Sequence, residues 1–220
     1  MEKYLYVLQK SSLFKQIKDT DILAILKCLN GRVVNFKKNK FIFLAGDTLN
    51  SMGLVLSGAV QITNDDIYGN KTILSELKKG SIFGETIAHA NLDKIPVSVI
   101  ASKDSDILMF DYRIIVKKCP KNCVFHNKLI ENMLEIIAKK IFMQNEKLEI
   151  LSQRSTREKL LTFFSLQSKA AGSNAFTISF DRQELADYLC VDRSALSREL
   201  GKMREEGIID FHKNNFKFLL

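Results

Sequence analysis

The sequence predicts an α+β chain: an N-terminal β-roll of the jelly-roll or double-stranded β-helix type, one long helix, and a C-terminal helical region closed by a β-hairpin. Three observations predict this order. Short apolar runs broken by glycine fill residues 32–111, an apolar heptad repeat follows over about 122–152, and two closely spaced helix patterns precede a hairpin pattern near the end. We expect domains at 1–120, 121–153 and 154–220.

Length and composition favour a globular protein of one large or two small domains. The chain has 220 residues, of which 46% are hydrophobic, and no apolar stretch approaches the length of a membrane span. Its first residues lack the apolar core and cleavage site of a signal peptide. We therefore expect a cytoplasmic protein without a membrane segment, whose four cysteines are reduced thiols.

The net charge of +8 and the isoelectric point near 9.2 suit an anionic partner without identifying it. From Ser152 onward, 11 Lys and Arg oppose 9 Asp and Glu, a net of +2, so +6 of the total lies in the first 151 residues. Bulk charge mainly aids nonspecific association. The identity of the partner therefore has to be inferred from individual side chains.

The N-terminal region alternates between short apolar runs and turn signals at Gly46-Asp47, Ser57-Gly58 and Gly69-Asn70. About eight short strands at this spacing favour a small antiparallel barrel or jelly roll. The predicted strands are 33–36, 41–44, 53–56, 60–63, 72–77, 97–100 and 107–110.

The long helix carries a seam whose members are spaced alternately by four and three residues. Such a seam over three heptads needs a partner to cover it, either a second copy in a two-fold dimer or the chain's own β-domain. Gln144 is its polar member and must pair across the dimer or meet a ligand. The seam comprises Ile130, Leu134, Ile137, Ile141, Gln144, Leu148 and Leu151.

A polar stretch, residues 151–159, interrupts the apolar pattern. Ser155 or Thr156 can cap a new helix that runs through Leu166 and ends before Gly172. We interpret the interruption as the hinge between the N-terminal and C-terminal domains.

Two short helices with a tight turn are predicted next. Leu185 and Leu189 face inward from the first helix, Cys190-Val191 makes the turn, and Asp192 is a good N-cap for the second helix. The turn position often held by glycine is cysteine here, so a left-handed backbone at that position would cost free energy.

The second helix places an apolar stripe opposite a polar face. Arginine can fork onto guanine, and serine is short enough to let a helix lie deep in the major groove of DNA. The alternative is an ordinary solvated helix pair. The stripe is Leu196, Leu200 and Met203. The predicted DNA-binding residues are Arg193, Ser194, Ser197 and Arg198, with Lys202, Gln183 and Lys213.

After Gly207, which ends this helix, alternating runs at 208–211 and 216–218 flank Lys213-Asn214-Asn215. Asparagine tolerates positive φ, so this pattern predicts a β-hairpin. A helix-turn-helix followed by a hairpin is a winged helix, and its wing would lie over a phosphate backbone.

Three local matches resemble one family. Residues 53–60 and 80–85 are similar to the glycine framework of a cyclic-nucleotide-binding domain, 155–160 to the start of a DNA-binding domain, and 193–198 to its recognition helix. In this order the whole chain resembles the Crp/Fnr family of bacterial transcription regulators. The resemblance implies a homodimer on a near-palindromic site in double-stranded DNA, with recognition helices about 34 Å apart, that activates or represses transcription with RNA polymerase.

The resemblance also implies where a cyclic nucleotide would bind, and the sequence departs there. Members that bind it follow Gly-Glu, about ten residues later, with an arginine that pairs with the cyclic phosphate. Here Gly84-Glu85 is followed by Lys94-Ile95-Pro96, with Ile95 or Pro96 at the arginine position. Without that bidentate pairing we expect the effector not to be cyclic AMP, although Lys94 could substitute as a point charge.

Other signals are weaker. An iron–sulfur cluster needs four thiolates, and the N-terminal region offers only Cys28. Cys119 and Cys123 are expected to be isolated small residues, with a reversible thiol switch as the alternative. His89 alone does not indicate haem. No metal or cofactor is therefore predicted.

The preferred hypothesis is a small organic or anionic effector bound between the β-roll and the long helix. Ligand binding would change the packing of two long helices and so the spacing of the recognition helices. The alternatives are binding of DNA without any ligand and a cyclic-nucleotide-binding module that controls another protein. The sequence contains no convergent set of catalytic residues, so we expect no enzyme. The predicted effector-binding residues are Gly84, Glu85, Thr86, Ser98, Gln144 and Asn145.

Overall fold

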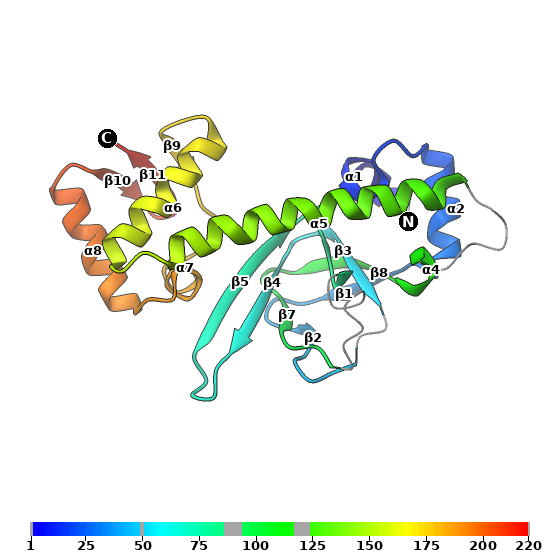
Figure 1. Ribbon diagram of the computed structural model, residues 1–220, viewed down its shortest axis with the longest axis horizontal. Coiled ribbons are helices and arrows are strands. Elements are labelled where there is room, and N and C mark those ends of the chain that lie inside the picture. Colours follow the sequence, from blue (N-terminus) through cyan, green and yellow to red (C-terminus); the bar gives the residue numbers. More distant parts are fainter. Residues whose placement is uncertain (1, 49–50, 86–93, 117–123, 220) are drawn as a thin grey trace. The chain divides into compact units, whose positions relative to one another are not determined.

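The computed structural model (Figure 1) describes residues 2–48, 51–85, 94–116 and 124–219. The chain forms two compact units, residues 1–140 and 141–220, so the division falls inside the long helix. Each unit has its own hydrophobic core. No helix among the described residues combines the length and apolar character needed to cross a bilayer.

Two four-stranded antiparallel sheets form the predicted β-roll of the first unit. One sheet has the order β1-β8-β3-β6 and the other the order β2-β7-β4-β5. The strands are β1 (Arg32–Phe36), β2 (Phe41–Phe43), β3 (Met52–Ser57), β4 (Ala59–Asp65), β5 (Lys71–Lys78), β6 (Ile82–Phe83), β7 (Ser98–Ala101) and β8 (Ser105–Phe110). The sequence pattern did not indicate β6, because a two-residue strand has no alternation to detect.

The interior of the roll explains one glycine of the predicted framework. A Cβ on Gly53 in β3 would collide with the ring of Phe83 in β6. That ring is fully buried and makes an edge contact with Phe43, with centroids 5.7 Å apart. Glycine at this position lets the aromatic side chain lie directly over the strand.

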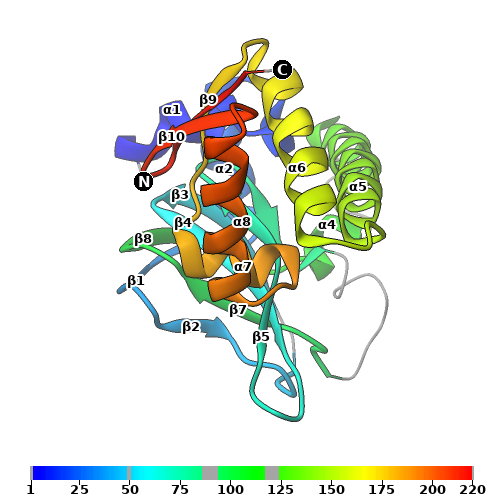
Figure 2. The same ribbon diagram turned by 90° about the vertical axis from the view of Figure 1, so that its left-hand side faces the viewer.

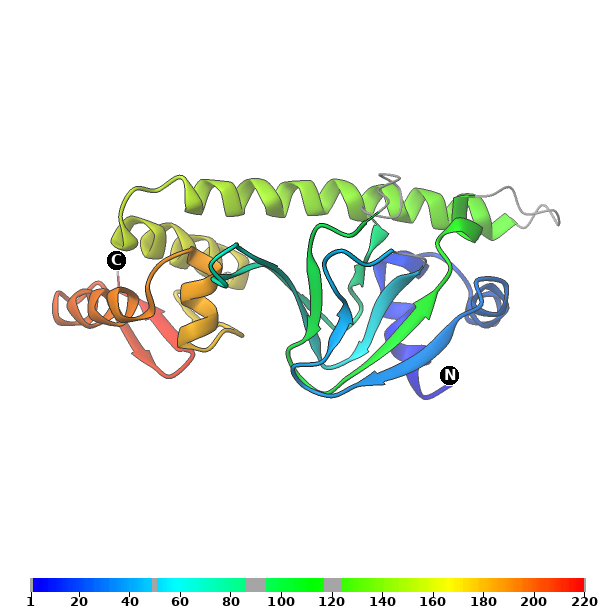
Figure 3. The same ribbon diagram turned by 90° about the horizontal axis from the view of Figure 1, so that it is seen from below.

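Short helices cover one end of the roll, where Figure 3 shows them beside the first half of α5. Leu8, Leu13 and Phe14 join Leu129 and Met133 of α5 in one buried cluster. These elements are η1 (Glu2–Tyr4), α1 (Leu5–Lys10), η2 (Ser12–Phe14), α2 (Asp19–Cys28), α4 (Arg113–Val116) and α5 (Val124–Leu151). The heptad pattern thus predicted the long helix to within two residues at each end.

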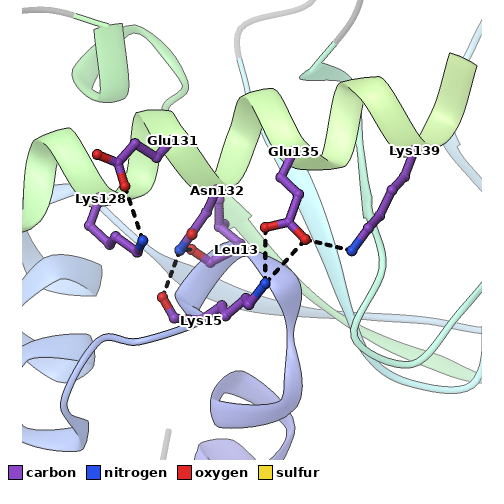
Figure 4. Close-up of polar contacts among 7 residues, drawn as sticks. All are labelled: Leu13, Lys15, Lys128, Glu131, Asn132, Glu135 and Lys139. Carbon is purple, nitrogen blue, oxygen red and sulfur yellow. Dashed lines mark hydrogen bonds and ion pairs between the residues drawn. The ribbon is translucent and has the colours of Figure 1, made fainter.

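Polar contacts fix the N-terminal segment to α5 (Figure 4). Asn132 is buried on the helix, and its side-chain amide donates to the carbonyl oxygens of Leu13 and Lys15, at 2.9 Å each. Lys15 also pairs with Glu135 at 3.1 Å. An amide can be buried at low cost when its hydrogen bonds are made in this way.

The second unit packs three helices around a small sheet, and Figure 2 shows α8 beside the hairpin of β10 and β11. The sheet order is β10-β11-β9. The buried rings of Phe164, from a helix, and Phe216, from the sheet, pack together with centroids 4.7 Å apart. The elements are α6 (Thr156–Ala171), β9 (Ala175–Thr177), α7 (Arg182–Leu189), α8 (Arg193–Glu205), β10 (Ile209–His212) and β11 (Asn215–Phe218).

Helix ends in this unit follow the sequence signals. Ser155 begins α6 with a capping box in which its hydroxyl accepts from the backbone of Glu158, and Gly172 ends the helix at φ +60°. The hairpin was also predicted, but the positive φ falls on Lys213, at +53°, and not on an asparagine. The third strand, β9, is too short to leave a periodic pattern.

Candidate DNA-binding interface and sensor site

The predicted recognition helix, α8, is fixed at its N-terminus by Asp192. One carboxylate oxygen of Asp192 accepts from the backbone N–H groups of Ser194 (2.7 Å) and Ala195 (3.2 Å), which confirms the predicted cap. The hydroxyl of Ser194 also donates to this oxygen. These hydrogen bonds, that of the Ser194 side chain first, hold the pKa of Asp192 below its ordinary value.

The two faces of α8 differ as the spacing predicted. Leu196, Leu200 and Met203 are buried in the unit. The predicted DNA-binding residues of this helix are all accessible on its other side. They are Arg193, Ser194, Ser197, Arg198 and Lys202.

The turn between α7 and α8 contains a left-handed residue at the position that is often glycine. Cys190 has φ +51° and ψ +56°, and the backbone N–H of the next residue, Val191, donates to Ala186 at 3.1 Å. A side chain in this conformation costs free energy relative to glycine. The thiol of Cys190 is free and exposed.

A cleft of about 720 Å³ brings three predicted residues together: Gln183 from α7, Arg193 from α8 and Lys213 from the turn of the wing. Arg182 also lines this cleft. The guanidinium of Arg182 donates to the carbonyl of Lys213 at 3.0 Å and lies 5.0 Å from the ring centroid of Phe211. The remaining lining residues are Asp181, Asn214 and Asn215.

Arg157 of α6 holds α8 from the other side, and sequence reasoning did not assign it a role. Two guanidinium nitrogens donate to Glu206 at 2.7 and 2.8 Å, and Nε donates to Glu199. Glu206 and Glu199 raise the pKa of Arg157 above its ordinary value, and Arg157 lowers that of Glu206. The bidentate geometry fixes the orientation of α8 on α6.

The predicted effector residues are divided between the two units, and one of them lies outside the described residues. Glu85 follows β6 and is 2% exposed, and Ser98 in β7 is buried with its hydroxyl accepting from the backbone of Ala45. Gln144 and Asn145 are exposed on the part of α5 that belongs to the second unit. Gly84 precedes Glu85 with φ +87°. Thr86, the alternative thiol pair Cys119 and Cys123, and His89 lie outside the described residues.

Glu85 has a cationic partner that the sequence patterns did not reveal. The ammonium of Lys140, on α5, lies 2.6 Å from Glu85 Oε1 and donates to the carbonyl of Ile82 at 2.8 Å. Lys140 lies four residues after the buried Ile136 and so shares its side of α5. A charged residue on the buried side of a helix needs a partner, and that signal was present in the sequence.

Ile95 is 2% exposed and belongs to the main hydrophobic cluster of the β-roll. Its backbone N–H donates to Asp47 at 2.9 Å, and its carbonyl accepts from Gly46 at 2.8 Å. Its neighbours in sequence, Lys94 and Pro96, are exposed. No group of three or more His, Cys, Asp or Glu residues that could hold a metal is found in the described parts of the chain.

Comparison with known proteins identifies both units. Residues 33–122 match the family model of the cyclic nucleotide-binding domain, and residues 158–219 match that of the Crp-like helix-turn-helix domain. The chain belongs to the Crp/Fnr family. It is therefore a transcription regulator of the Crp/Fnr type, a family whose members are not enzymes.

Similar Crp/Fnr proteins cover most of the chain. The "Cyclic AMP receptor protein" of Thermus thermophilus is 24% identical over 202 residues, 90% of this chain and 88% of that protein. The "Global nitrogen regulator" of a Nostoc species is 24% identical over 187 residues, 82% of each. The solved structure of the c-di-GMP-responsive regulator CLP from Xanthomonas campestris has the same fold, with a TM-score of 0.74 at 15% identity over 90% of this chain and 98% of that one.

The contacts of Arg157 lead to a prediction about the Crp-like domain. We expect Arg157→Met to lower the melting temperature and to speed amide exchange in α8, because Glu199 and Glu206 lose their shared partner. In a Glu206→Gln background the same change should have a smaller effect, since residues in one network are not additive. Circular dichroism and hydrogen-exchange mass spectrometry measure both quantities.

Arg154, an exposed arginine three residues earlier, provides the matched control. Arg154→Met should leave the exchange of α8 unchanged. An effect of Arg157→Met of the same size in the presence and absence of Glu206 would contradict the proposed coupling.

Proposed function

We propose that the protein acts as a homodimer that binds a near-palindromic DNA operator and whose affinity for it responds to a small effector in the first unit. The observation that carries this proposal is the exposed face of α8, capped by Asp192 and adjoining a cleft whose lining includes Lys213 of the wing. A helix with such a face enters a major groove, and a basic wing neutralises phosphates beside it.

In this proposal the exposed arginines of α8 contact the DNA bases. Arg193 and Arg198 can each present two donors to one guanine, and Ser197 leaves room for the helix to approach the bases. Gln183 and Lys213, at the cleft, would contact the backbone and fix the register. Lys202 would add a phosphate contact one turn further along α8.

Ser194 sets this chain apart from members that carry glutamate there to accept from cytosine. Its hydroxyl donates to Asp192, so it serves the cap of α8. We infer that base preference in the outer part of each half-site differs accordingly.

The seam of α5 supports the homodimer. Leu134, Ile141 and Leu148 are 62%, 57% and 63% exposed, and Ile130 is 36% exposed. Apolar side chains in a row on one helix face favour burial against a matching helix. Ile137 and Leu151 are half-buried in their own units and would contribute less, while the exposed Gln144 would lie opposite its counterpart.

We infer that the effector binds beside Glu85 and Lys140, with Gly84, Thr86 and Ser98 on the β-roll side and Gln144 and Asn145 supplied by α5 of either protomer. An anionic group on such a ligand could share the ammonium of Lys140 with Glu85. Cyclic AMP fits poorly, because Ile95 is buried in the core and neither Ile95 nor the exposed Pro96 offers a guanidinium for its phosphate.

Such a regulator would act where the bacterial chromosome lies, in the cytoplasm. We infer contact with RNA polymerase from the family alone.

Replacing Arg198 should remove specific recognition without unfolding the protein. We expect Arg198→Ala to weaken discrimination by about 1–3 kcal/mol for each guanine that the side chain reads, because its guanidinium supplies the donors and its removal leaves the core of the unit intact. The measurement is binding to an operator selected from a random library by the wild-type protein and to a scrambled duplex.

Lys169 of α6 is an exposed cation outside the predicted DNA face and serves as the control. Lys169→Ala should leave the ratio of the two affinities close to that of the wild type. An unchanged ratio in Arg198→Ala would remove α8 from the proposal.

A charge on the seam should separate the protomers. We expect Leu134→Glu to shift the protein from dimer to monomer in sedimentation velocity, because two carboxylates would meet across the interface. Phe142, which is 76% exposed on α5 but off the seam, is the matched position. Phe142→Glu should remain a dimer, and a dimeric Leu134→Glu protein would contradict the seam.

The effector site is tested by thermal shift with cyclic AMP, acetate, succinate and citrate. We expect no stabilisation by micromolar cyclic AMP. An anion that stabilises the wild type should fail to stabilise Lys140→Met, yet still stabilise Lys139→Met, which removes the neighbouring exposed ammonium. Stabilisation by cyclic AMP, or equal stabilisation of both variants by an anion, would contradict the site.

A further inference from the structure

The C-terminus of α7 is held in an unusual way. The last carbonyl groups of a helix have no partner within it. Here two lysines from other helices supply those partners. Lys147 of α5 donates to the carbonyl of Tyr188, and Lys159 of α6 donates to those of Leu189 (3.1 Å) and Cys190 (3.4 Å). Cations at this end of a helix are also favoured by its dipole.

Lys147 is the more deeply placed of the two. Its side chain is 7% exposed, and its ammonium lies 3.1 Å from the centroid of the Tyr188 ring. That ring is itself fixed between Phe180 and Phe163, with centroids 4.8 and 5.8 Å away. A buried cation over an aromatic face gains more than an exposed one. Moving Lys147 would therefore disturb the aromatic core that supports α7.

The next residue along α5 has the opposite character. Leu148 is 63% exposed and belongs to the predicted dimer seam. Since adjacent residues differ by about 100° around a helix, one turn of α5 contacts α7 through Lys147 and presents the seam through Leu148. A rotation of α5 at the seam would displace the ammonium of Lys147.

We propose that Lys147 and Lys159 are positioning residues for DNA recognition: they fix the C-terminus of α7, and with it the turn that begins α8, to α5 and α6. The proposal goes beyond the DNA-binding function and rests on it, because a positioned recognition helix matters only if α8 reads DNA. Neither lysine belongs to the predicted DNA face, and their effect is transmitted through Cys190 and Val191.

The charge of Lys147 provides a readout that packing alone would not give. Burial lowers the pKa of Lys147 to about 7; Cys190 opposes this shift, and the positive charge of Lys159 reinforces it. On α7, burial raises the pKa of the Tyr188 hydroxyl. In the unfolded chain Lys147 keeps its ordinary pKa of about 10.4, so between about 7 and 10.4 the folded state binds fewer protons and stability rises with pH.

As the pH rises, the stability of the fold and the fixation of α7 by Lys147 are therefore expected to change in opposite directions. Above pH 7 the folded protein gains stability as Lys147 loses its proton, while the contact of its ammonium with the Tyr188 ring and carbonyl weakens. We expect the ratio of affinities for a selected operator and a scrambled duplex to fall from pH 6 to pH 8.5 in the wild type. The ratio cancels the nonspecific effect of other titrating groups.

The experiment uses the full chain with the changes Lys147→Met, Lys147→Arg and Lys159→Met, and with Lys169→Met as the control on an exposed lysine. We expect Lys147→Met to lower the affinity ratio about tenfold at pH 6 and to make it independent of pH. Lys147→Arg, which stays charged, should retain the ratio at pH 8.5. The same series in a Cys190→Ser background removes the thiol that opposes the lowering of the pKa of Lys147.

Hydrogen exchange of residues 186–192 measures the fixation of α7 without DNA. Exchange should be faster in Lys147→Met and Lys159→Met than in wild type and Lys169→Met. If the wild-type protein selects no operator, the proposed function is wrong. Hydrogen exchange then still shows whether Lys147 and Lys159 fix the C-terminus of α7. If Lys147→Met does not fold, Lys159→Met and the pH series of the wild type decide. An affinity ratio independent of pH in the wild type, or unchanged exchange in Lys159→Met, would overturn the proposal.

Discussion

The fold depends on polar side chains along the buried face of α5, each of which donates to the backbone of a different segment. Asn132 donates to the N-terminal segment at Leu13 and Lys15, Lys140 to β6 at Ile82, and Lys147 to α7 at Tyr188. An apolar contact tolerates small sliding, whereas a buried amide or ammonium loses its compensation if its acceptor moves away. These donors therefore fix each segment at one level along the helix.

Both sides of α5 depart from the pattern of an ordinary surface helix, although its inner side also buries Leu129, Met133 and Ile136. Its solvent side carries leucine and isoleucine, while its inner side carries a lysine that is 7% exposed. The polar groups inside make hydrogen bonds, and the apolar row outside is exposed in this chain. The ion pair of Lys140 with Glu85 also joins the first part of this helix to the β-roll.

The elements that the sequence predicted are those with a long period or a strong local signal. The alternating four- and three-residue steps predicted α5, and the residue types at Ser155 and Asp192 predicted two helix starts. Strands β6 and β9 escaped, because two or three residues do not establish an alternation. The roles of Lys140 and Lys147 were not predicted, because the apolar repeat defines only the other side of the helix. Their hydrogen-bond acceptors are also distant in sequence. The role of Arg157 was not predicted because its partners, Glu199 and Glu206, lie 42 and 49 residues away in sequence.

The burial of Ile95 has a consequence for engineering. Its side chain lies in the hydrophobic core, and both of its backbone groups are tied to the turn at Gly46 and Asp47. Writing an arginine into this position would therefore bury a guanidinium among aliphatic side chains instead of offering it to a ligand. An arginine that faces a ligand from this position would therefore require a different loop, with the preceding turn rebuilt to match.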